Sequence, residues 1–146
     1  MRAYDVMTAD VITVRAETTV PEIVRLLAEH HISGAPVVND EGEVIGMVNQ
    51  RDLFVKQKRV PYVGTEAPPL FGQFVQPEKI AETYREARNL TAADVMTKVV
   101  VTVDAWDDVG HVAETMARHD LRRVPVVRDG KLVGIISRSD IINLLI

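Results

Sequence analysis

Two consecutive arginines stand where they could bind an anion. Arg122 and Arg123 come directly before Val124-Pro125, at the expected start of a strand. A guanidinium group makes planar, bidentate contacts with phosphate oxygens, so this pair suits a ligand that carries a phosphate. The alternative is a solvated basic pair, which is common before a strand.

A hydroxyl and a carboxylate follow at Ser137 and Asp140, near the start of the last expected helix. A carboxylate can accept hydrogen bonds from neighbouring hydroxyl groups, and a hydroxyl can donate to a phosphate oxygen. Together with the arginines, these side chains have the chemistry to hold a sugar phosphate. The alternative is that Asp140 only caps the helix and Ser137 only ends a strand. Two nearby charges, Lys131 and Arg138, are expected to lie on the surface.

Other kinds of chemistry have little support in the sequence. The chain has no cysteine, which excludes disulfides, thiol catalysis and thiolate metal sites. Neither the Gly-x-Gly-x-x-Gly nor the P-loop pattern occurs, and no nucleophile-elbow motif is present. The histidines, of which His30 and His119 are expected at helix ends, form no metal-binding pattern. We therefore expect neither an enzyme nor a metal site.

The composition is typical of a soluble globular protein. The 146 residues are 47% hydrophobic and 26% charged, which is enough for a compact core. A net charge of −4 gives no overall attraction to nucleic acid or to an anionic membrane. No apolar run is long enough to span a bilayer, and no signal-peptide core follows Met1. We expect a cytoplasmic protein without a nucleic-acid or membrane partner.

The sequence contains an internal repeat. A shift of 89 residues places Asp5-Val6-Met7-Thr8 on Asp94-Val95-Met96-Thr97 and Pro36-Val37-Val38 on Pro125-Val126-Val127. A one-residue deletion then reduces the shift to 88 and aligns Gly42, Gly46 and Asp52 with Gly130, Gly134 and Asp140. Such a repeat predicts two related structural units.

Each repeat predicts the element order β-α-β-β-α. Apolar residues at helical spacing predict one helix through Val20, Ile23, Val24 and Leu27, and its counterpart through Val109, Val112, Ala113 and Met116. The candidate N-caps are Thr18 or Thr19 and Asp107 or Asp108. β-rich runs around hairpin turns predict the strands Val11–Val14, Ala35–Val38, Val44–Val48, Val99–Val103, Val124–Val127 and Leu132–Ile136. A final helix is expected near Asp52 and near Asp140.

The repeats are expected at residues 1–56 and 92–146. One unit of this size cannot bury a sufficient core, so we expect an α+β fold whose two repeats pack through their sheets with pseudo-twofold symmetry. A proline-containing segment, residues 57–91, separates them, and Glu78–Asn89 within it predicts a helix. A lid, a docking surface and a tolerated insertion are all compatible with this segment.

The duplicated unit resembles a pair of cystathionine-β-synthase (CBS) domains, the arrangement called a Bateman module. The resemblance rests on the two Asp-Val-Met-Thr starts, on Ile32-Ser33-Gly34-Ala35-Pro36-Val37-Val38, on the glycine-containing hairpins and on Ser137-Arg138-Ser139-Asp140. It implies a regulatory module that binds an adenosine compound (AMP, ADP, ATP or S-adenosylmethionine) in clefts between the repeats. With no effector domain expected, the signal would pass to a partner protein or through a homodimer.

The resemblance also implies roles for single residues in the main cleft. Asp140 would hold the ribose hydroxyls, while Ser137, Arg123 and the helix-start N–H groups would contact phosphate. Arg122 is expected to face the opposite cleft. The base slot would be lined by Thr8, Val11, Ile12 and Ser33, with Ile135 as its apolar wall. For these base-slot residues, plain core packing is the alternative.

A second, weaker cleft would centre on Asp52. Its base side would be lined by Thr97, Val100 and Val101, with Met47 as the wall. Two departures from the first cleft put it in doubt: Asn49 stands where Ser137 stands in the second repeat, and Gly34 stands where Arg123 does.

A ligand-independent oligomerisation or adaptor module is the alternative function. Asn49, the aromatic and proline-containing residues between the repeats, and the apolar Leu144-Leu145-Ile146 favour it. These last three residues are expected to pack on the partner repeat or on another subunit.

Overall fold

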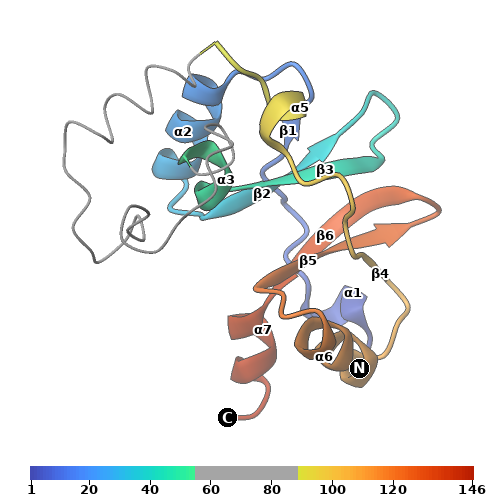
Figure 1. Cartoon of the computed structure of the whole chain (residues 1–146). Helices are drawn as coiled ribbons and strands as arrows, with labels where there is room; N and C mark the ends of the chain where they lie inside the picture. Colours follow the sequence, from blue (N-terminus) through green and yellow to red (C-terminus); the bar gives the residue numbers. More distant parts are fainter. Residues whose placement is uncertain (55–88) are drawn as a thin grey trace. The chain divides into compact units, whose positions relative to one another are not determined.

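The computed structural model describes residues 1–54 and 89–146 (Figure 1). The expected helix Glu78–Asn89 and most of the 57–91 segment lie outside the described residues. The described elements fall into two three-stranded sheets with helices, so the predicted α+β class is confirmed.

The first sheet has the strand order β1-β2-β3. Its strands are β1 (Val14–Arg15), β2 (Gly34–Val38) and β3 (Val44–Asn49), with α2 (Val20–Glu29) between β1 and β2 and α3 (Gln50–Phe54) after β3. α2 buries Val20, Ile23 and Leu27, three of the four residues whose spacing predicted it.

The second sheet repeats this order as β4-β5-β6. Its strands are β4 (Val103–Asp104), β5 (Arg123–Arg128) and β6 (Lys131–Ser137), with α6 (Val109–Arg118) and α7 (Arg138–Asn143). β4 pairs in parallel with β5, and β5 pairs antiparallel with β6, with a bulge between Val126 and Val127. The β2, β3, β5 and β6 strands match their predicted ranges to within one residue at each end.

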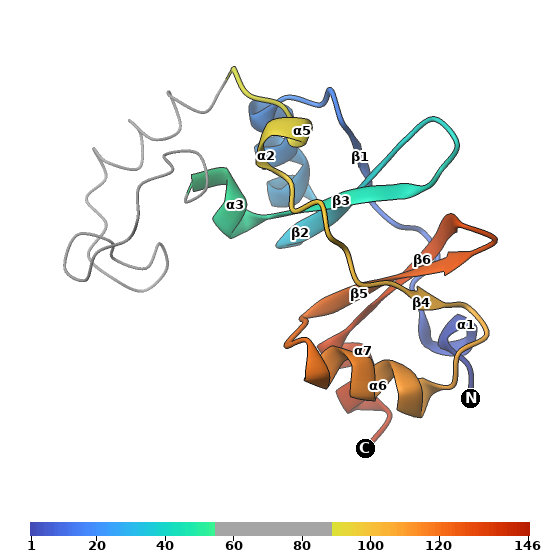
Figure 2. The same ribbon diagram turned by 45° about the vertical axis from the view of Figure 1, so that its right-hand side comes forward.

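One face of the second sheet is covered by helices (Figure 2). Val124 and Val126 of β5 and Ile136 of β6 are fully buried against Val112 and Met116 of α6. These residues alternate along their strands, as expected for a sheet with one helix-covered face. Arg123, Ile135 and Ser137 occupy the intervening positions and therefore point to the opposite face.

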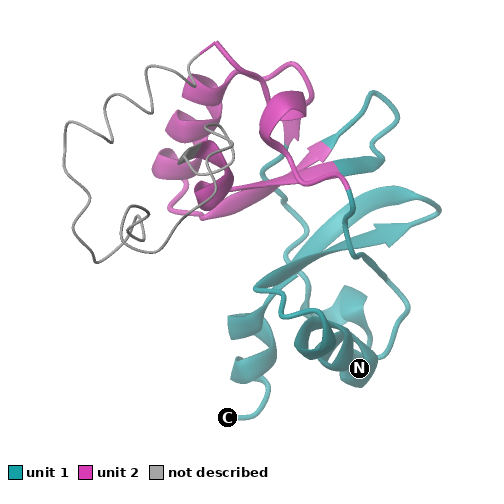
Figure 3. Ribbon diagram, in the orientation of Figure 1, with its two compact units in different colours: residues 1–13, 38–45, 99–146 teal, residues 14–37, 46–98 magenta. Residues whose placement is uncertain are grey.

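The chain forms two compact units, and each unit combines residues of both sequence repeats (Figure 3). Unit 1 comprises Met1–Thr13, Val38–Ile45 and Val99–Ile146, and unit 2 comprises Val14–Val37 and Gly46–Lys98. The start of the first repeat thus belongs to the same unit as the second repeat's sheet. The division into 1–56 and 92–146 describes the repeated sequence and stays a prediction.

The repeated Asp-Val-Met-Thr segment explains why the start of each repeat lies with the sheet of the other repeat. In unit 1, Asp5 Oδ2 accepts the Arg2 N–H (2.8 Å) at the start of the short helix α1 (Ala3–Val6). Met7 packs against Gly134 of β6, where a Cβ would lie 2.7 Å from Met7 Cγ. Thr8 and Ile135 then exchange two backbone hydrogen bonds of 2.9 and 3.0 Å. Val6 packs against the core of the same unit, so each residue of the motif has a structural partner there.

Unit 2 repeats the same contacts with the second copy of the motif. Asp94 Oδ2 accepts the Thr91 N–H (2.9 Å) at the start of α5 (Ala92–Val95). Met96 packs on Gly46, and Thr97 exchanges backbone hydrogen bonds with Met47 of β3. Neither α1 nor α5 was predicted from the sequence, although Thr91-x-x-Asp94 is a recognisable capping sequence.

The helix ends agree with the sequence. Thr19 Oγ1 accepts the Glu22 N–H at the start of α2, and Asp108 Oδ2 accepts the Gly110 N–H at the start of α6. His30 and His119 are the C-caps of these two helices, as expected.

The first strand of each repeat was predicted too early and too long. Val11–Val14 and Val99–Val103 were expected, whereas β1 covers Val14–Arg15 and β4 covers Val103–Asp104. The pairing of β4 with β5 starts only at Val103, opposite Val126, and Val99 is 88% exposed. β-branched residues form a strand only where a neighbouring strand supplies hydrogen bonds and packing.

Candidate functional site

Ser137 and Asp140 form a reciprocal cap at the start of α7. The Asp140 N–H donates to Ser137 Oγ (3.3 Å), and the Ser137 N–H donates to Asp140 Oδ2 (2.8 Å). Ser137, and not Asp140, is the N-cap residue. A carboxylate has more acceptor positions than this one hydrogen bond uses, so Asp140 retains capacity for hydroxyl groups of a ligand.

The backbone amides expected to assist a phosphate are partly engaged within the protein. The Arg138 N–H donates to the Arg122 carbonyl oxygen (2.9 Å), and the Asp140 N–H donates to Ser137. Because α7 has only six residues, a phosphate here would depend on side-chain cations and hydroxyls.

Arg123 lies directly across from Ser137. The two residues are partners in the antiparallel register of β5 and β6, which places their side chains on the same face of the sheet. Burial, and then the positive charge of Arg122, lower the pKa of Arg123. A guanidinium stays protonated in proteins, so the shift indicates a partly desolvated positive charge that a bound anion would stabilise.

Thr8 and Ile135 continue the same face. Ile135 precedes Ser137 by two residues on β6, a spacing of about 7 Å along one side of a strand. Thr8 bridges Ile135 from the edge of β6 that β5 does not occupy. The structure therefore brings Thr8, Ile135, Ser137 and Arg123 together on one face of unit 1, with Asp140 attached through the cap.

Val11 lies on a different part of unit 1. It borders a hollow of about 210 Å³ that is lined by Ala9, Val11, Thr13, Val38, Gly42, Leu132 and Val133. Neither Ile135 nor the cap residues line this hollow. Ile12 is half-buried and is not among the lining residues either.

Unit 2 shows the corresponding arrangement around Asp52. Asp52 Oδ2 accepts the Asn49 N–H (3.1 Å), as Asp140 does from Ser137. Thr97 bridges Met47, which is buried and two residues before Asn49 on β3. The backbone scaffold is thus duplicated, while the hydroxyl of Ser137 and the guanidinium of Arg123 are replaced by Asn49 and Gly34.

Four further residues were predicted to contact a ligand, but they do not belong to the group around Asp140 or to the group around Asp52. Arg122 is exposed, and Val100 and Val101 are half-buried in unit 1. Ser33 lies in unit 2, where its carbonyl oxygen accepts the Gln50 N–H (2.9 Å). Their contribution to a ligand site stays a prediction.

Two features of unit 1 were not predicted from the sequence, one beside the site and one away from it. Arg138 and Lys131 are both exposed, as predicted. However, the Arg138 guanidinium also donates hydrogen bonds to Leu121 and Asp120 in the turn before β5. Elsewhere in unit 1, Trp106 stacks on Tyr4 with ring centroids 6.0 Å apart, and the Arg128 guanidinium lies 4.6 Å from the Trp106 ring centroid.

The tail residues do not pack as expected on the chain itself. Leu145 is 83% exposed and Ile146 is 99% exposed, whereas Leu144 is 42% exposed.

Across residues 1–54 and 89–146, no group of three or more histidines and carboxylates could hold a metal ion. Among the same residues, no helix is long and apolar enough to cross a membrane.

Comparison with known proteins identifies the repeat. The CBS domain family model matches residues 3–59 and 92–146. An uncharacterized protein of Methanocaldococcus jannaschii is 30% identical over 97% of this chain, which spans only 41% of that protein's length.

Two solved structures have the same fold. The CBS domain of a CBS-domain-containing membrane protein from Sphaerobacter thermophilus is 30% identical, with a TM-score of 0.74, and the match covers 100% of this chain and 88% of that one. The structure of CBSX2 in complex with AMP is 24% identical, with a TM-score of 0.75 over 99% and 95% of the two chains. The two matched repeats cover most of the sequence, and the chain belongs to the CBS domain family.

Proposed function

We propose that this chain is a regulatory module that binds an adenosine nucleotide. Asp140 accepts hydrogen bonds from the ribose hydroxyls, Arg123 and Ser137 contact the phosphate, and Thr8 and Ile135 border the base. The observation that carries the proposal is the placement of a hydroxyl and a partly buried arginine beside an apolar residue on one sheet face, with the Asp140 carboxylate held next to them by the helix cap. Such a combination supplies ribose, phosphate and base contacts in one place.

The ligand class is supported by the chain's own residues. CBSX2 binds AMP in its solved complex, but at that identity the likeness concerns the fold alone. The positive charge at Arg122 and Arg123 favours a phosphorylated adenosine over S-adenosylmethionine, whose sulfonium is itself positive. The Asp52 group lacks both the Ser137 hydroxyl and the Arg123 charge, so we propose that it is the weaker site.

The module acts as a sensor in this proposal and not as an enzyme. A ligand shifts the equilibrium between conformations by its difference in affinity for them. The output passes to a partner protein or through self-association.

A thermal-melt panel tests the proposal. The purified protein is heated with AMP, ADP, ATP, S-adenosylmethionine or GTP, with NADH as a control. A ligand at 100 times its dissociation constant adds about 2.7 kcal/mol, which raises the midpoint by about 5–10 °C in a protein of this size. We expect this shift with a phosphorylated adenosine compound and its loss in Asp140→Asn.

Asp94→Asn is the matched control for this variant. Asp94 plays the same capping role at α5 as Asp140 does at α7, so its loss weakens a helix cap without touching the proposed site. Asp94→Asn should lower the midpoint but keep the ligand shift. A shift that survives in Asp140→Asn would contradict the site.

A ligand-independent oligomerisation module is the second candidate. The exposed apolar side chains of Ile142 (55%), Leu145 and Ile146 near the end of α7 favour it. Unchanged melting with every nucleotide, together with a stable dimer in sedimentation analysis, would support this reading in place of the sensor.

A further inference from the structure

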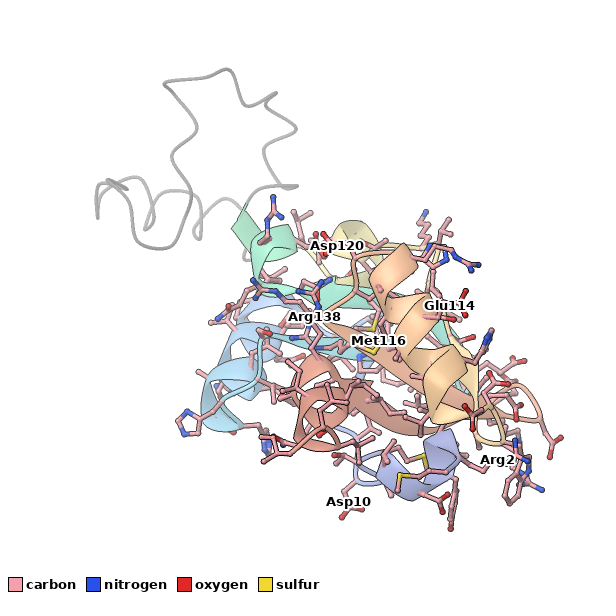
Figure 4. The ribbon with its side chains drawn as sticks, turned by 90° about the horizontal axis from the view of Figure 1, so that it is seen from below. Arg2, Asp10, Glu114, Met116, Asp120 and Arg138 are labelled. Atoms are coloured by element: carbon pink, nitrogen blue, oxygen red, sulfur yellow. The ribbon has the colours of Figure 1, made fainter. Side chains whose placement is uncertain are left out.

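Arg138 ties the start of α7 to the turn that precedes β5. Its backbone N–H donates to the Arg122 carbonyl oxygen (2.9 Å), and its Nε donates to the Leu121 carbonyl oxygen (2.8 Å). Its Nη2 forms an ion pair of 2.7 Å with Asp120 Oδ1 (Figure 4). One residue therefore makes a hydrogen bond to each of three consecutive residues in the turn.

The place of these bonds matters more than their strength. The Arg138 side chain is 48% exposed and that of Asp120 is 95% exposed, and an exposed ion pair contributes little to stability. However, Arg138 directly follows Ser137, and the turn directly precedes Arg123. The Arg138 side chain thus links the two strand ends that carry the proposed ribose and phosphate contacts.

The turn has a backbone conformation that such a link can hold. Asp120 has a φ of 51°, in the left-handed region that is sparsely populated by residues with a side chain. Aspartate tolerates this region better than most residues, and here its carboxylate also accepts from Arg138.

The first repeat provides an internal comparison. His31, the counterpart of Asp120, has a φ of 53°, and the Gln50 N–H donates to Ser33 as the Arg138 N–H does to Arg122. The backbone arrangement is therefore the same in both repeats. The side chains differ, because Gln50 and His31 cannot form an arginine–carboxylate pair. The ion pair thus occurs in the repeat that carries Arg122 and Arg123.

The Asp120–Arg138 ion pair also affects the charge balance around the turn. Arg122, Arg123 and Arg138 are three positive charges within one turn and the adjacent helix start. Asp120 neutralises Arg138 and directs its guanidinium to the turn. The proposed phosphate contact is then assigned to Arg123, with the exposed Arg122 beside it in the sequence.

We propose that Arg138 is a positioning residue which, with Asp120, holds the turn of residues 120–122 so that Arg123 is aligned for a phosphate next to Ser137. This inference rests on the proposed nucleotide site. It makes the Asp120–Arg138 pair, and not only the arginine pair, responsible for the preference of this site for a phosphorylated ligand over the nucleoside.

The test compares AMP and adenosine binding to Arg138→Gln, Asp120→Asn and Arg118→Gln by calorimetric titration. Arg118–Glu114 is a second exposed ion pair of similar length (2.6 Å), within α6. It therefore controls for the loss of a surface charge and an ion pair. We expect Arg138→Gln and Asp120→Asn to weaken AMP binding about tenfold, corresponding to about 1.4 kcal/mol, with adenosine affinity and the melting midpoint almost unchanged. Arg118→Gln should bind both ligands like the unmodified protein.

Asp120→Asn separates positioning from direct contact. If Arg138 touched the phosphate itself, removing its carboxylate partner would release the guanidinium and strengthen AMP binding. Stronger AMP binding by Asp120→Asn would therefore overturn the positioning role. Full AMP affinity in Arg138→Gln would also overturn it while leaving the proposed function intact.

Hydrogen exchange of the Arg138 amide gives a readout that needs no ligand. The backbone amide of residue 138 donates to the Arg122 carbonyl oxygen. Faster exchange of this amide in Arg138→Gln supports the positioning role of the Arg138 side chain, and unchanged exchange contradicts it. If the unmodified protein does not bind AMP, the proposed function and the positioning role fall together.

Discussion

Adding one methyl group at Gly134 should disturb both the fold and the proposed base slot. A Cβ at this position would lie 2.7 Å from Met7 Cγ and 3.0 Å from Met7 Cβ. Carbon atoms normally approach to about 3.5–4.0 Å. Because even the Met7 Cβ is too close, rotation of the side-chain end cannot relieve the overlap, and the segment that carries Thr8 must shift away from Ile135.

The expected cost follows from these distances. Overpacking of this kind costs about 1–3 kcal/mol, and the gain from replacing a strand glycine by alanine offsets about 0.5–1 kcal/mol. Gly134→Ala should therefore lower the free energy of unfolding by up to about 2.5 kcal/mol, measured by urea denaturation with an unchanged m-value. Because Thr8 moves, AMP binding should also weaken.

A double-mutant cycle with Met7→Ala tests the cause. Met7→Ala removes Met7 Cγ and the atoms beyond it, which lie nearest to the new methyl group, and leaves only the contact of 3.0 Å with Met7 Cβ. The double variant should therefore be more stable than the sum of the single changes by about 1 kcal/mol or more. Gly46→Ala, which meets Met96 in the same way in unit 2, should cost similar stability but leave the Asp140 site unaffected. Additive effects at Gly134 and Met7 would refute the reasoning.

Two further predictions concern the helix caps and the pH dependence of binding. Thr19→Ala and Asp108→Ala should each lower the unfolding free energy by about 0.5–2 kcal/mol in denaturant titrations, because each removes a side-chain acceptor for a helix N–H; equal stability would show that the caps contribute nothing. A phosphate monoester loses its second proton near pH 6, and Arg123 remains protonated despite its lowered pKa, so AMP affinity should rise between pH 5 and 7.5 while adenosine affinity stays flat. The rise should be smaller in Arg123→Gln, and an equal rise for adenosine would contradict the phosphate contact.

The repeat made most of the fold predictable from the sequence. Two copies of one apolar pattern predicted α2 and α6, and the hairpin glycines predicted β2, β3, β5 and β6. Gly42 and Gly130 have φ of 82° and 81°, a conformation that favours glycine at these turns. The lengths of β1 and β4 depend on where a neighbouring strand begins, which local composition does not encode.

The candidate site was predictable as a set of residue types, but not as a geometry. Ser137, Asp140 and Arg123 could be selected from their chemistry and their position in the repeat. The cross-strand register of Arg123 and Ser137 and the bridge between Thr8 and Ile135 depend on long-range pairing. The Asp120–Arg138 pair joins residues 18 positions apart across a hairpin, so each charge taken alone resembled an ordinary surface residue.

The most direct test of the central claim is a calorimetric titration of AMP and of adenosine against the unmodified protein, Asp140→Asn and Arg123→Gln. A carboxylate that holds the ribose affects both ligands, whereas an arginine that holds the phosphate affects only AMP. We predict that Asp140→Asn weakens both ligands and that Arg123→Gln weakens AMP alone, each by about 10- to 100-fold, as expected for hydrogen bonds to charged groups. Absence of AMP binding by the unmodified protein at millimolar concentration, or unchanged affinity in both variants, would contradict the account.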